Sequence, residues 1–177
     1  KYRLNTFSSI KALRQKYSEE GLDHNNLHTD PLLQFQSWYQ QAVDSGIPEP
    51  NAMCLATATL SAAPSQRTVL MKSYDEDGFI FYTNFGSRKS KQMAENNLVS
   101  IIFPWIALHR QVIIEGRVEK ISTAESIKYF STRPRGSKLG AWSSHQSEVL
   151  TTRSLLETKL AQMKNKFAKG DIPLPSF

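Results

Sequence analysis

The sequence has little cysteine: Cys54 is the one cysteine among 177 residues. A single cysteine excludes an internal disulfide and fits the reducing cytosol, so we expect a cytoplasmic protein in which Cys54 is a small buried hydrophobe. Long hydrophobic runs are also missing. The longest, at residues 99–108, is interrupted by Pro104 and is too short to cross a bilayer. Residues 1–13 have no continuous apolar core of the kind that a signal peptide needs.

Several motifs of cofactor binding and catalysis are absent as well. The sequence contains no G-x-G-x-x-G, no Walker A loop, no G-x-S-x-G and no pattern typical of a catalytic cysteine. The four histidines do not have the spacing of metal ligands, so we expect no metal site. The chain therefore carries none of the best-known signatures of dinucleotide-binding proteins, P-loop proteins and hydrolases.

The composition that is present is that of one globular domain, which we expect to span residues 1–177. Hydrophobic residues make up 40% of the chain and charged residues 21%. Lysine and arginine number 22 against 16 acidic residues, which gives a net charge of +6. This excess favours an anionic partner, whether nucleic acid, an acidic membrane surface or a phosphorylated small molecule.

Two helices are predicted before the first strand, at residues 8–22 and 30–46. Asp30 is a good N-cap for the second helix and Pro31 suits its first turn. Its predicted buried stripe consists of Leu32, Phe35, Tyr39 and Val43.

Five segments then read as strands, at residues 52–60, 67–74, 78–84, 99–105 and 110–121, because they are rich in Val, Ile, Phe, Tyr and Thr. Short turn sequences connect most of them, which predicts an antiparallel sheet or a small closed barrel. Gly116, in the middle of the last strand, suits a bend or a bulge. A helix separates the third and fourth strands.

The last third of the chain is predicted to be helical. Ser122 and Glu125 form a capping box ahead of a helix that Pro134 ends, and a long amphipathic helix runs to Gly170. The predicted fold class is therefore mainly β with flanking helices (α+β).

The segment FYTNFGSRKSKQ, residues 81–92, turns from a strand into a helix. Ser87 can cap this helix, and the free N–H groups behind it form an anion site. Arg88 and Lys89 are unfavourable at a helix start unless an anion binds there. The alternative is a solvated basic face, which we keep for Lys91.

Other polar residues could also hold a ligand. Arg67 and Lys72 are five residues apart in an apolar strand, so a regular strand points their side chains to opposite faces. The alternative is that both lie at the solvent-exposed ends of the strand. Tyr129, Arg133 and Ser137 could bind a phosphate, or form only a surface Tyr–Arg pair. Weaker candidates, equally readable as exposed polar residues, are Gln111, Gln146 and Ser147.

A nucleic-acid-binding barrel is the rival interpretation of these cations. Such a site needs exposed aromatic side chains between the cations. Here Phe79, Phe81, Tyr82 and Phe103 have the spacing of core residues. The residues alone therefore favour phosphate binding by a barrel-like domain.

Several long segments together resemble the pyridoxine (pyridoxamine) 5′-phosphate oxidase family. They are QRTVLMKSYDEDGFIFYTNFGSRKSKQMAENN, FPW followed by RQVIIEG, KYFSTRPRGSKLGAWSSHQS and PLPSF, and the likeness runs over residues 14–177. The resemblance implies a homodimeric antiparallel split β-barrel that binds FMN at the subunit interface.

The resemblance also implies roles for residues at the matching positions. The residues implied to bind FMN are Arg67, Thr68, Val69, Leu70, Met71, Lys72, Tyr82, Thr83, Arg88, Lys89, Gln111, Gln146 and Ser147. The residues implied to bind the substrate are Arg14, Tyr17, Lys72, Tyr129, Arg133 and Ser137. Two ligands, each with its own phosphate, would explain why Arg67 and Lys72 point apart.

The implied reaction is the oxidation of pyridoxine 5′-phosphate or pyridoxamine 5′-phosphate to pyridoxal 5′-phosphate. A hydride passes from the 4′ carbon to the flavin, and O2 reoxidises the flavin and yields hydrogen peroxide. No nucleic acid or membrane partner is implied.

The ends of the chain carry two further expectations. Residues 1–29 are expected to form a mobile segment that closes over the substrate. Family members continue past the position of Phe177 with further active-site residues, so we expect a tail that is missing here. The alternative is a short, non-catalytic FMN- or pyridoxal-phosphate-binding split barrel.

Overall fold

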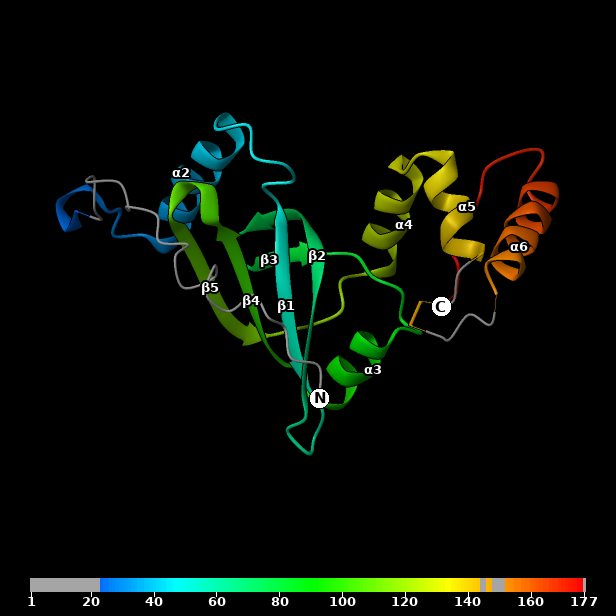
Figure 1. Cartoon of the computed structure of the whole chain (residues 1–177), viewed down its shortest axis with the longest axis horizontal. Helices are drawn as coiled ribbons and strands as arrows, with labels where there is room; N and C mark the ends of the chain where they lie inside the picture. Colours follow the sequence, from blue (N-terminus) through cyan, green and yellow to red (C-terminus); the bar gives the residue numbers. More distant parts are fainter. Residues whose placement is uncertain (1–22, 144–145, 148–151, 177) are drawn as a thin grey trace, which may run out of the picture.

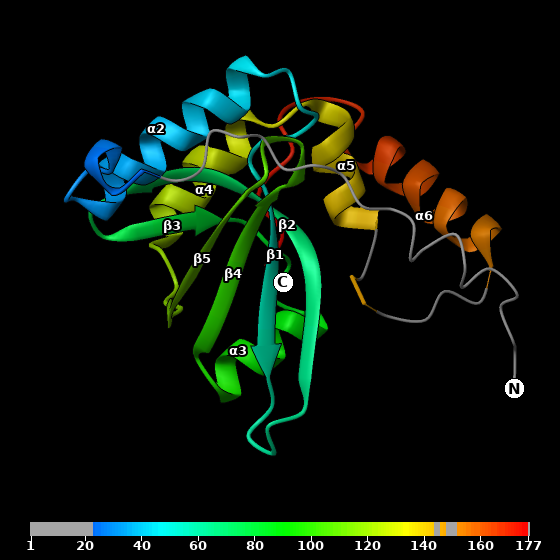
Figure 2. The same cartoon turned by 60° about the vertical axis from the view of Figure 1, so that its left-hand side comes forward.

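The structure is a computed structural model that describes residues 23–143, 146–147 and 152–176. Five strands form one antiparallel sheet in the order β3-β2-β1-β4-β5. They are β1 (Ala52–Ala58), β2 (Pro64–Asp75), β3 (Gly78–Phe81), β4 (Leu98–Trp105) and β5 (Arg110–Arg117). The sheet curls into half a barrel (Figures 1 and 2), with β3 and β5 at its two edges. The predicted class, mainly β with flanking helices and a split barrel, is confirmed.

The hairpin between β2 and β3 forms where the sequence predicts a turn. Asp75 pairs with Gly78, and the Asp75 carboxylate accepts from the backbone N–H groups of Asp77 and Gly78 at 3.0 and 3.1 Å. Gly78 has a φ of 147°, a conformation that a side chain would oppose. The turn therefore depends on the glycine that the sequence supplies.

One register shift interrupts the sheet, and it lies in β2 rather than in β5. Of the bend or bulge predicted at Gly116, the bulge is wrong, because β4 and β5 pair without a shift from Leu98 opposite Arg117 to Trp105 opposite Arg110. The shift lies instead between Met71 and Ser73 of β2. A bulge inserts one residue and changes which face the following side chains point to.

Helix α2 (Pro31–Asp44) begins as predicted, with the Asp30 carboxylate accepting from the N–H of Leu32 at 2.7 Å. The predicted stripe is partly wrong. Val43 is 43% exposed, and Ala42 is fully buried in its place. The predicted helix at residues 8–22 lies outside the described residues.

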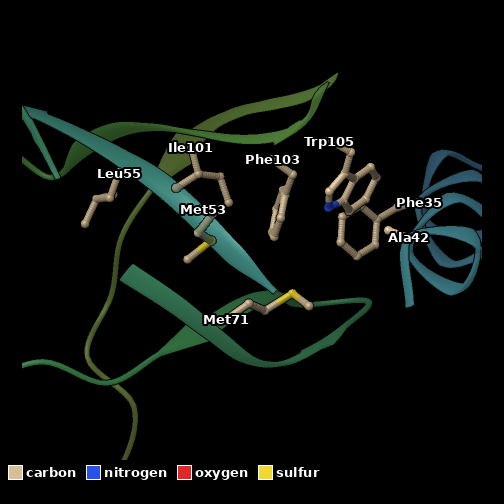
Figure 3. Packing of buried hydrophobic residues seen from close by; sticks show 8 residues of the cluster. All are labelled: Phe35, Ala42, Met53, Leu55, Met71, Ile101, Phe103 and Trp105. Atoms are coloured by element: carbon tan, nitrogen blue, oxygen red, sulfur yellow. The ribbon is translucent and has the colours of Figure 1, made fainter. Parts of the chain in front are cut away.

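The main core lies between α2 and the concave face of the sheet (Figure 3). It contains Phe35 and Ala42 from α2, Met53 and Leu55 from β1, Met71 from β2, and Ile101, Phe103 and Trp105 from β4. Phe35 is its centre, with ring centroids 4.8 Å from Phe79 and 5.1 Å from Phe103. Aromatic pairs at these distances favour tilted and edge-on packing, which holds α2 firmly on the sheet.

Four more helices complete the described chain, together with the short 3-10 turns η1 (His24–Asn26) and η2 (Ile106–Leu108). They are α3 (Arg88–Glu95), α4 (Thr123–Thr132), α5 (Arg135–Ser143) and α6 (Arg153–Lys166). Helix α4 has the predicted capping box and stops before Pro134, whereas α5 was not predicted.

Helices α4, α5 and α6 stand beside the sheet (Figure 1) and have a core of their own. Its buried members are Phe130, Leu139 and Ile172. The indole N–H of Trp142 donates to the carbonyl of Pro173 at 2.8 Å, which ties the extended C-terminal segment to α5. None of the helices described is long and apolar enough to cross a membrane.

Candidate functional site

A cleft of about 1980 Å³ runs along β2 and β3 and continues past α3 to α4 and α5. Most of the candidate residues line it. From the predicted FMN set these are Arg67, Thr68, Val69, Leu70, Lys72, Tyr82, Thr83, Arg88, Lys89, Gln146 and Ser147. From the predicted substrate set they are Lys72, Tyr129, Arg133 and Ser137. Residues spread over 80 positions of sequence thus share one cavity, as a common ligand site requires.

Lys89 is the most unusual of these residues, because its side chain is only 7% exposed. Its ammonium donates to Gln146 Oε1 at 2.6 Å, Thr83 Oγ1 at 3.0 Å and Ser87 Oγ at 3.4 Å. All three acceptors are neutral. Burial, and then the charge of Arg67, lower the pKa of Lys89. A buried cation surrounded by neutral oxygens is stabilised when an anion binds beside it.

The start of α3 holds Lys89 in this position. Ser87 is fully buried and caps the helix by accepting from the N–H of Ser90, as predicted. The Ser90 hydroxyl donates to the carbonyl of Asn84 at 2.8 Å, which fixes the loop before the helix. Arg88 is exposed toward the cleft and Lys91 is exposed to solvent. Two cations and the positive end of a helix therefore meet at the cleft.

Arg67 adds a third positive charge from β2. Its guanidinium donates to the Leu55 carbonyl at 3.0 Å and to the Thr57 hydroxyl at 2.7 Å. Burial and the nearby charge of Arg88 lower the pKa of Arg67. Arg67 thus lies close enough to Arg88 and to Lys89 for their positive charges to repel, so this end of the cleft would favour an anion.

The bulge in β2 changes how the strand faces the cleft. Before it, side chains alternate regularly, so that Arg67, Val69 and Met71 share one face, whereas Lys72 and Ser73 on the bulge are both exposed. Residues 64–70 pair with β1 only, because β3 pairs with residues 71–75. Within the described chain, this part of β2 is a sheet edge that lines the cleft.

Across the cleft, Tyr82 after β3 stacks on Tyr129 of α4. The ring centroids are 3.6 Å apart and the planes differ by 6°. Burial, followed by the charges of Glu125 and Tyr129, raises the pKa of Tyr82. This stack joins Tyr82, which is predicted to bind FMN, to Tyr129, which is predicted to bind the substrate.

The second group of cleft residues comes from α4 and α5. Tyr129 and Arg133 are four residues apart, a spacing that would put both on one helix face. However, α4 ends at Thr132, and Pro134 forces Arg133 into an extended conformation. The Arg133 guanidinium lies 5.6 Å from the centre of the Phe130 ring. Ser137, on α5, lines the same cleft and is exposed.

Ser147 carries backbone strain at the cleft. Its φ of 72° is in the left-handed region that residues other than glycine rarely adopt. Strain of this kind collects at ligand sites, where the surrounding structure maintains it.

Two predicted residues, Met71 and Gln111, do not line the cleft, and two others lie outside the described residues. The Met71 side chain is 4% exposed and packs in the main core. Gln111 lies on β5 opposite Pro104, at the far edge of the sheet. Arg14 and Tyr17 lie outside the described residues.

Three polar residues that contact Arg67 were missed by the sequence analysis. They are Thr57, Ser65 and Gln92, which hydrogen-bond to one another and to Arg67. Thr57 continues the inward alternation of Met53 and Leu55, so a hydroxyl at that position was a readable signal. Over the described ranges, no three His, Cys, Asp or Glu side chains are placed to hold a metal ion.

Comparison with known proteins gives a consistent result. Residues 39–167 match the family described as pyridoxamine 5′-phosphate oxidase. A pyridoxine/pyridoxamine 5′-phosphate oxidase from Rippkaea orientalis is 54% identical over 168 residues, which are 95% of this chain and 79% of that protein. An enzyme of the same name from Yersinia pestis is 48% identical, over 95% of this chain and 77% of its own length.

Two solved structures are similar in fold. PhzG from Burkholderia lata, in complex with tetrahydrophenazine-1-carboxylic acid, has a TM-score of 0.81 and 26% identity over 89% of this chain and 78% of its own. A pyridoxamine 5′-phosphate oxidase-related, FMN-binding protein from Nostoc punctiforme has a TM-score of 0.57 and 15% identity, over 74% of this chain and 73% of its own. The second likeness shows the fold alone.

Proposed function

Since this chain belongs to the pyridoxamine 5′-phosphate oxidase family, we propose that it binds FMN in the cleft and oxidises pyridoxine 5′-phosphate or pyridoxamine 5′-phosphate to pyridoxal 5′-phosphate. The electron acceptor is O2 and the second product is hydrogen peroxide. Oxidation of the amine also consumes water and releases ammonia. The single cysteine favours the cytosol as the place of the reaction.

The observation that carries this proposal is the uncompensated charge at the start of α3. Lys89 is buried among neutral oxygens, the charge of Arg67 lowers the pKa of Lys89, and the charge of Arg88 lowers the pKa of Arg67. A phosphate monoester carries a charge of about −1.5 to −2 near pH 7 and three strong acceptor oxygens. The phosphate of FMN suits this site, because it would relieve the repulsion and accept from the N–H groups of α3.

The rest of the FMN-binding set suits a flat, polar-edged ring. Thr68 and Leu70 lie on the edge of β2 that has no β3 partner, and backbone groups at such an edge can recognise a ring by hydrogen bonds. Thr83 and Gln146 already form a polar pair, with 3.3 Å between Thr83 Oγ1 and Gln146 Oε1. We propose that these groups hold FMN at fixed orientation, and bound FMN supplies the two-electron redox chemistry.

We assign the substrate phosphate to the second group of cations. Lys72 on the bulge, Arg133 after α4 and the hydroxyls of Tyr129 and Ser137 line the same cleft as the first group. A guanidinium, an ammonium and two hydroxyls can together hold a phosphate. Binding this remote group would orient the 4′ carbon for reaction, which lowers the entropic barrier to the chemical step. Arg14 and Tyr17 stay predicted to close over the substrate.

We further propose that the protein is a homodimer. Thr68, Cys54, Ile102 and Ile113 pair across four strands and form a row on the convex face of the sheet. Ile113 is 55% exposed in the single chain, and a second copy packed on this face would cover it. Such packing would also give Gln111, which lies away from the cleft of its own chain, a place in the site.

One experiment tests the function directly. The purified chain is titrated with FMN by fluorescence quenching and then supplied with pyridoxine 5′-phosphate in air, with formation of the aldehyde and of peroxide followed together. Equal amounts of both products are expected. Failure to bind FMN would refute the proposal, and tight FMN binding without turnover would favour the non-catalytic alternative.

A further inference from the structure

A polar cluster at the wall of the cleft holds Arg67, with two of its three members buried and the third, Ser65, lining the cleft. It consists of Thr57, Ser65 and Gln92, and we call it the Arg67 support cluster. Thr57 is 3% exposed and Gln92 is 4% exposed. The cluster joins two neighbouring strands to α3, because Thr57 lies opposite Ser65 in the β1–β2 pairing and Gln92 comes from the helix.

The support cluster and the Leu55 carbonyl together accept all four hydrogens on the terminal nitrogens of Arg67. Nη1 donates to the Leu55 carbonyl and to Thr57 Oγ1. Nη2 donates to Ser65 Oγ at 2.8 Å and to Gln92 Oε1 at 3.4 Å. The orientation of the guanidinium is therefore set by the protein before any anion arrives.

The direction of each hydrogen bond follows from Arg67, since a guanidinium can only donate. Thr57 and Ser65 each accept from Arg67, so each has its single hydroxyl hydrogen left to donate. Both donate it to Gln92 Oε1, at 2.7 Å in each case. The amide oxygen of Gln92 is thus the acceptor at which the whole network ends.

We propose that Gln92 is a positioning residue for Arg67, and through Arg67 for the anion at the start of α3. This inference rests on the proposed function, in which that anion is the phosphate of FMN. Gln92 acts by accepting the two hydroxyl hydrogens, which leaves Thr57 and Ser65 free to receive the guanidinium. Loss of this acceptor turns the hydroxyl hydrogens toward Arg67 and releases its fixed orientation.

The neutrality of Gln92 matters as much as its acceptor oxygen. A carboxylate in its place would accept the same hydrogens, but it would also pair with the charge of Arg67. The charge offered to the phosphate would then fall, although the geometry of the support cluster would be kept. The geometry therefore predicts that glutamate and methionine at position 92 both weaken FMN binding, for different reasons.

The test measures the FMN dissociation constant of the full chain by fluorescence titration, with folding checked by circular dichroism and thermal melting. Gln92→Met is expected to raise the constant about tenfold, the effect of weakening one hydrogen bond to a charged group. Gln92→Glu keeps the acceptor and therefore the fold, and it is expected to raise the constant at least as much.

A double-mutant cycle separates positioning from a general effect on packing. In an Arg67→Met background, Gln92→Met is expected to cause no further loss of FMN affinity, because the residue it positions is gone. In a Lys89→Met background, the full tenfold loss is expected again. An equal loss in both backgrounds would overturn the inference.

Two other results would test the positioning role of Gln92 and the proposed function separately. A Gln92→Met protein that folds and binds FMN as tightly as the wild type would overturn the positioning role while leaving the proposed function intact. A wild-type protein that does not bind FMN would overturn the proposed function and, with it, this inference.

Discussion

Replacement of Lys89 by methionine should separate the function of this residue from its place in the fold. Methionine has nearly the same length and no charge, so it can fill the buried space that Lys89 occupies at 7% exposure. The change removes an ammonium that has three neutral acceptors and no charge to balance it among the described residues. We therefore expect the protein without ligand to fold at least as stably as the wild type.

The cost of Lys89→Met should appear when FMN binds. A hydrogen bond to a charged group contributes about 1.5 to 3 kcal/mol, which corresponds to an increase of roughly 10- to 150-fold in the FMN dissociation constant. Fluorescence titration measures this constant, and Lys91→Met is the matched control, because Lys91 lies on the same helix but is exposed. A Lys89→Met protein that binds FMN within about twofold of the wild type, or a control that loses as much, would refute the reasoning.

The same variant tests the pH dependence of stability. The pKa of Lys89 is lower in the fold than its ordinary value of 10.5, so the unfolded chain binds more protons between the two values. Stability of the ligand-free protein therefore rises as pH increases from the lowered pKa toward 10.5. Thermal melting should show this rise in the wild type and in Lys91→Met. Its persistence in Lys89→Met would mean that another group causes it.

Three more predictions concern the substrate, the core and the dimer. Arg133→Ala should raise the KM for pyridoxine 5′-phosphate by about tenfold or more without releasing FMN; loss of FMN would contradict two separate phosphate sites. Phe35→Ala should destabilise the main core by about 3 to 5 kcal/mol, measured by urea unfolding, and a loss below about 1 kcal/mol would contradict its central place. Ile113→Asp should convert the proposed dimer to a monomer in light scattering, and an unchanged dimer would show that another face joins the two copies.

Much of the fold could be predicted because local rules act on short segments. Asp30 and Pro31 mark the start of α2, and Asp75 with Gly78 marks the β2–β3 turn; both are set by backbone hydrogen bonds within a few residues. The start of α3 was predicted for the same reason, since Ser87 caps it directly. These features depend little on the rest of the chain.

The features that the sequence did not predict depend on contacts between distant segments. The bulge between Met71 and Ser73 depends on how β3 pairs with β2. The local sequence contains no signal that predicts this pairing. Helix α5 begins directly after Pro134 and contains Gly136 and Gly140, so its propensity is poor, and packing of Leu139 in the second core stabilises it instead.

The sequence predicted which residues form the candidate site better than it predicted how they are arranged. The misplaced cations near Ser87 pointed to an anion, but the burial of Lys89 depends on Gln146, which lies 57 positions away. Gln92 was missed because nothing in its helix distinguishes it. Its importance comes from Thr57 and Ser65, which the hairpin brings beneath Arg67.

The two separate cores have a consequence for how the molecule opens. The core of the sheet and the core of α4, α5 and α6 share no residue, and the contacts described between these two parts of the molecule include the Tyr82–Tyr129 stack and the hydrogen bond from Lys89 to Gln146. Such cores behave as distinct cooperative units, so amide hydrogens in the helical unit should exchange faster than those in the sheet. A ligand that bridges the cleft would couple the two units and make their exchange rates converge. On this view the cofactor also serves as a structural element that unites the fold.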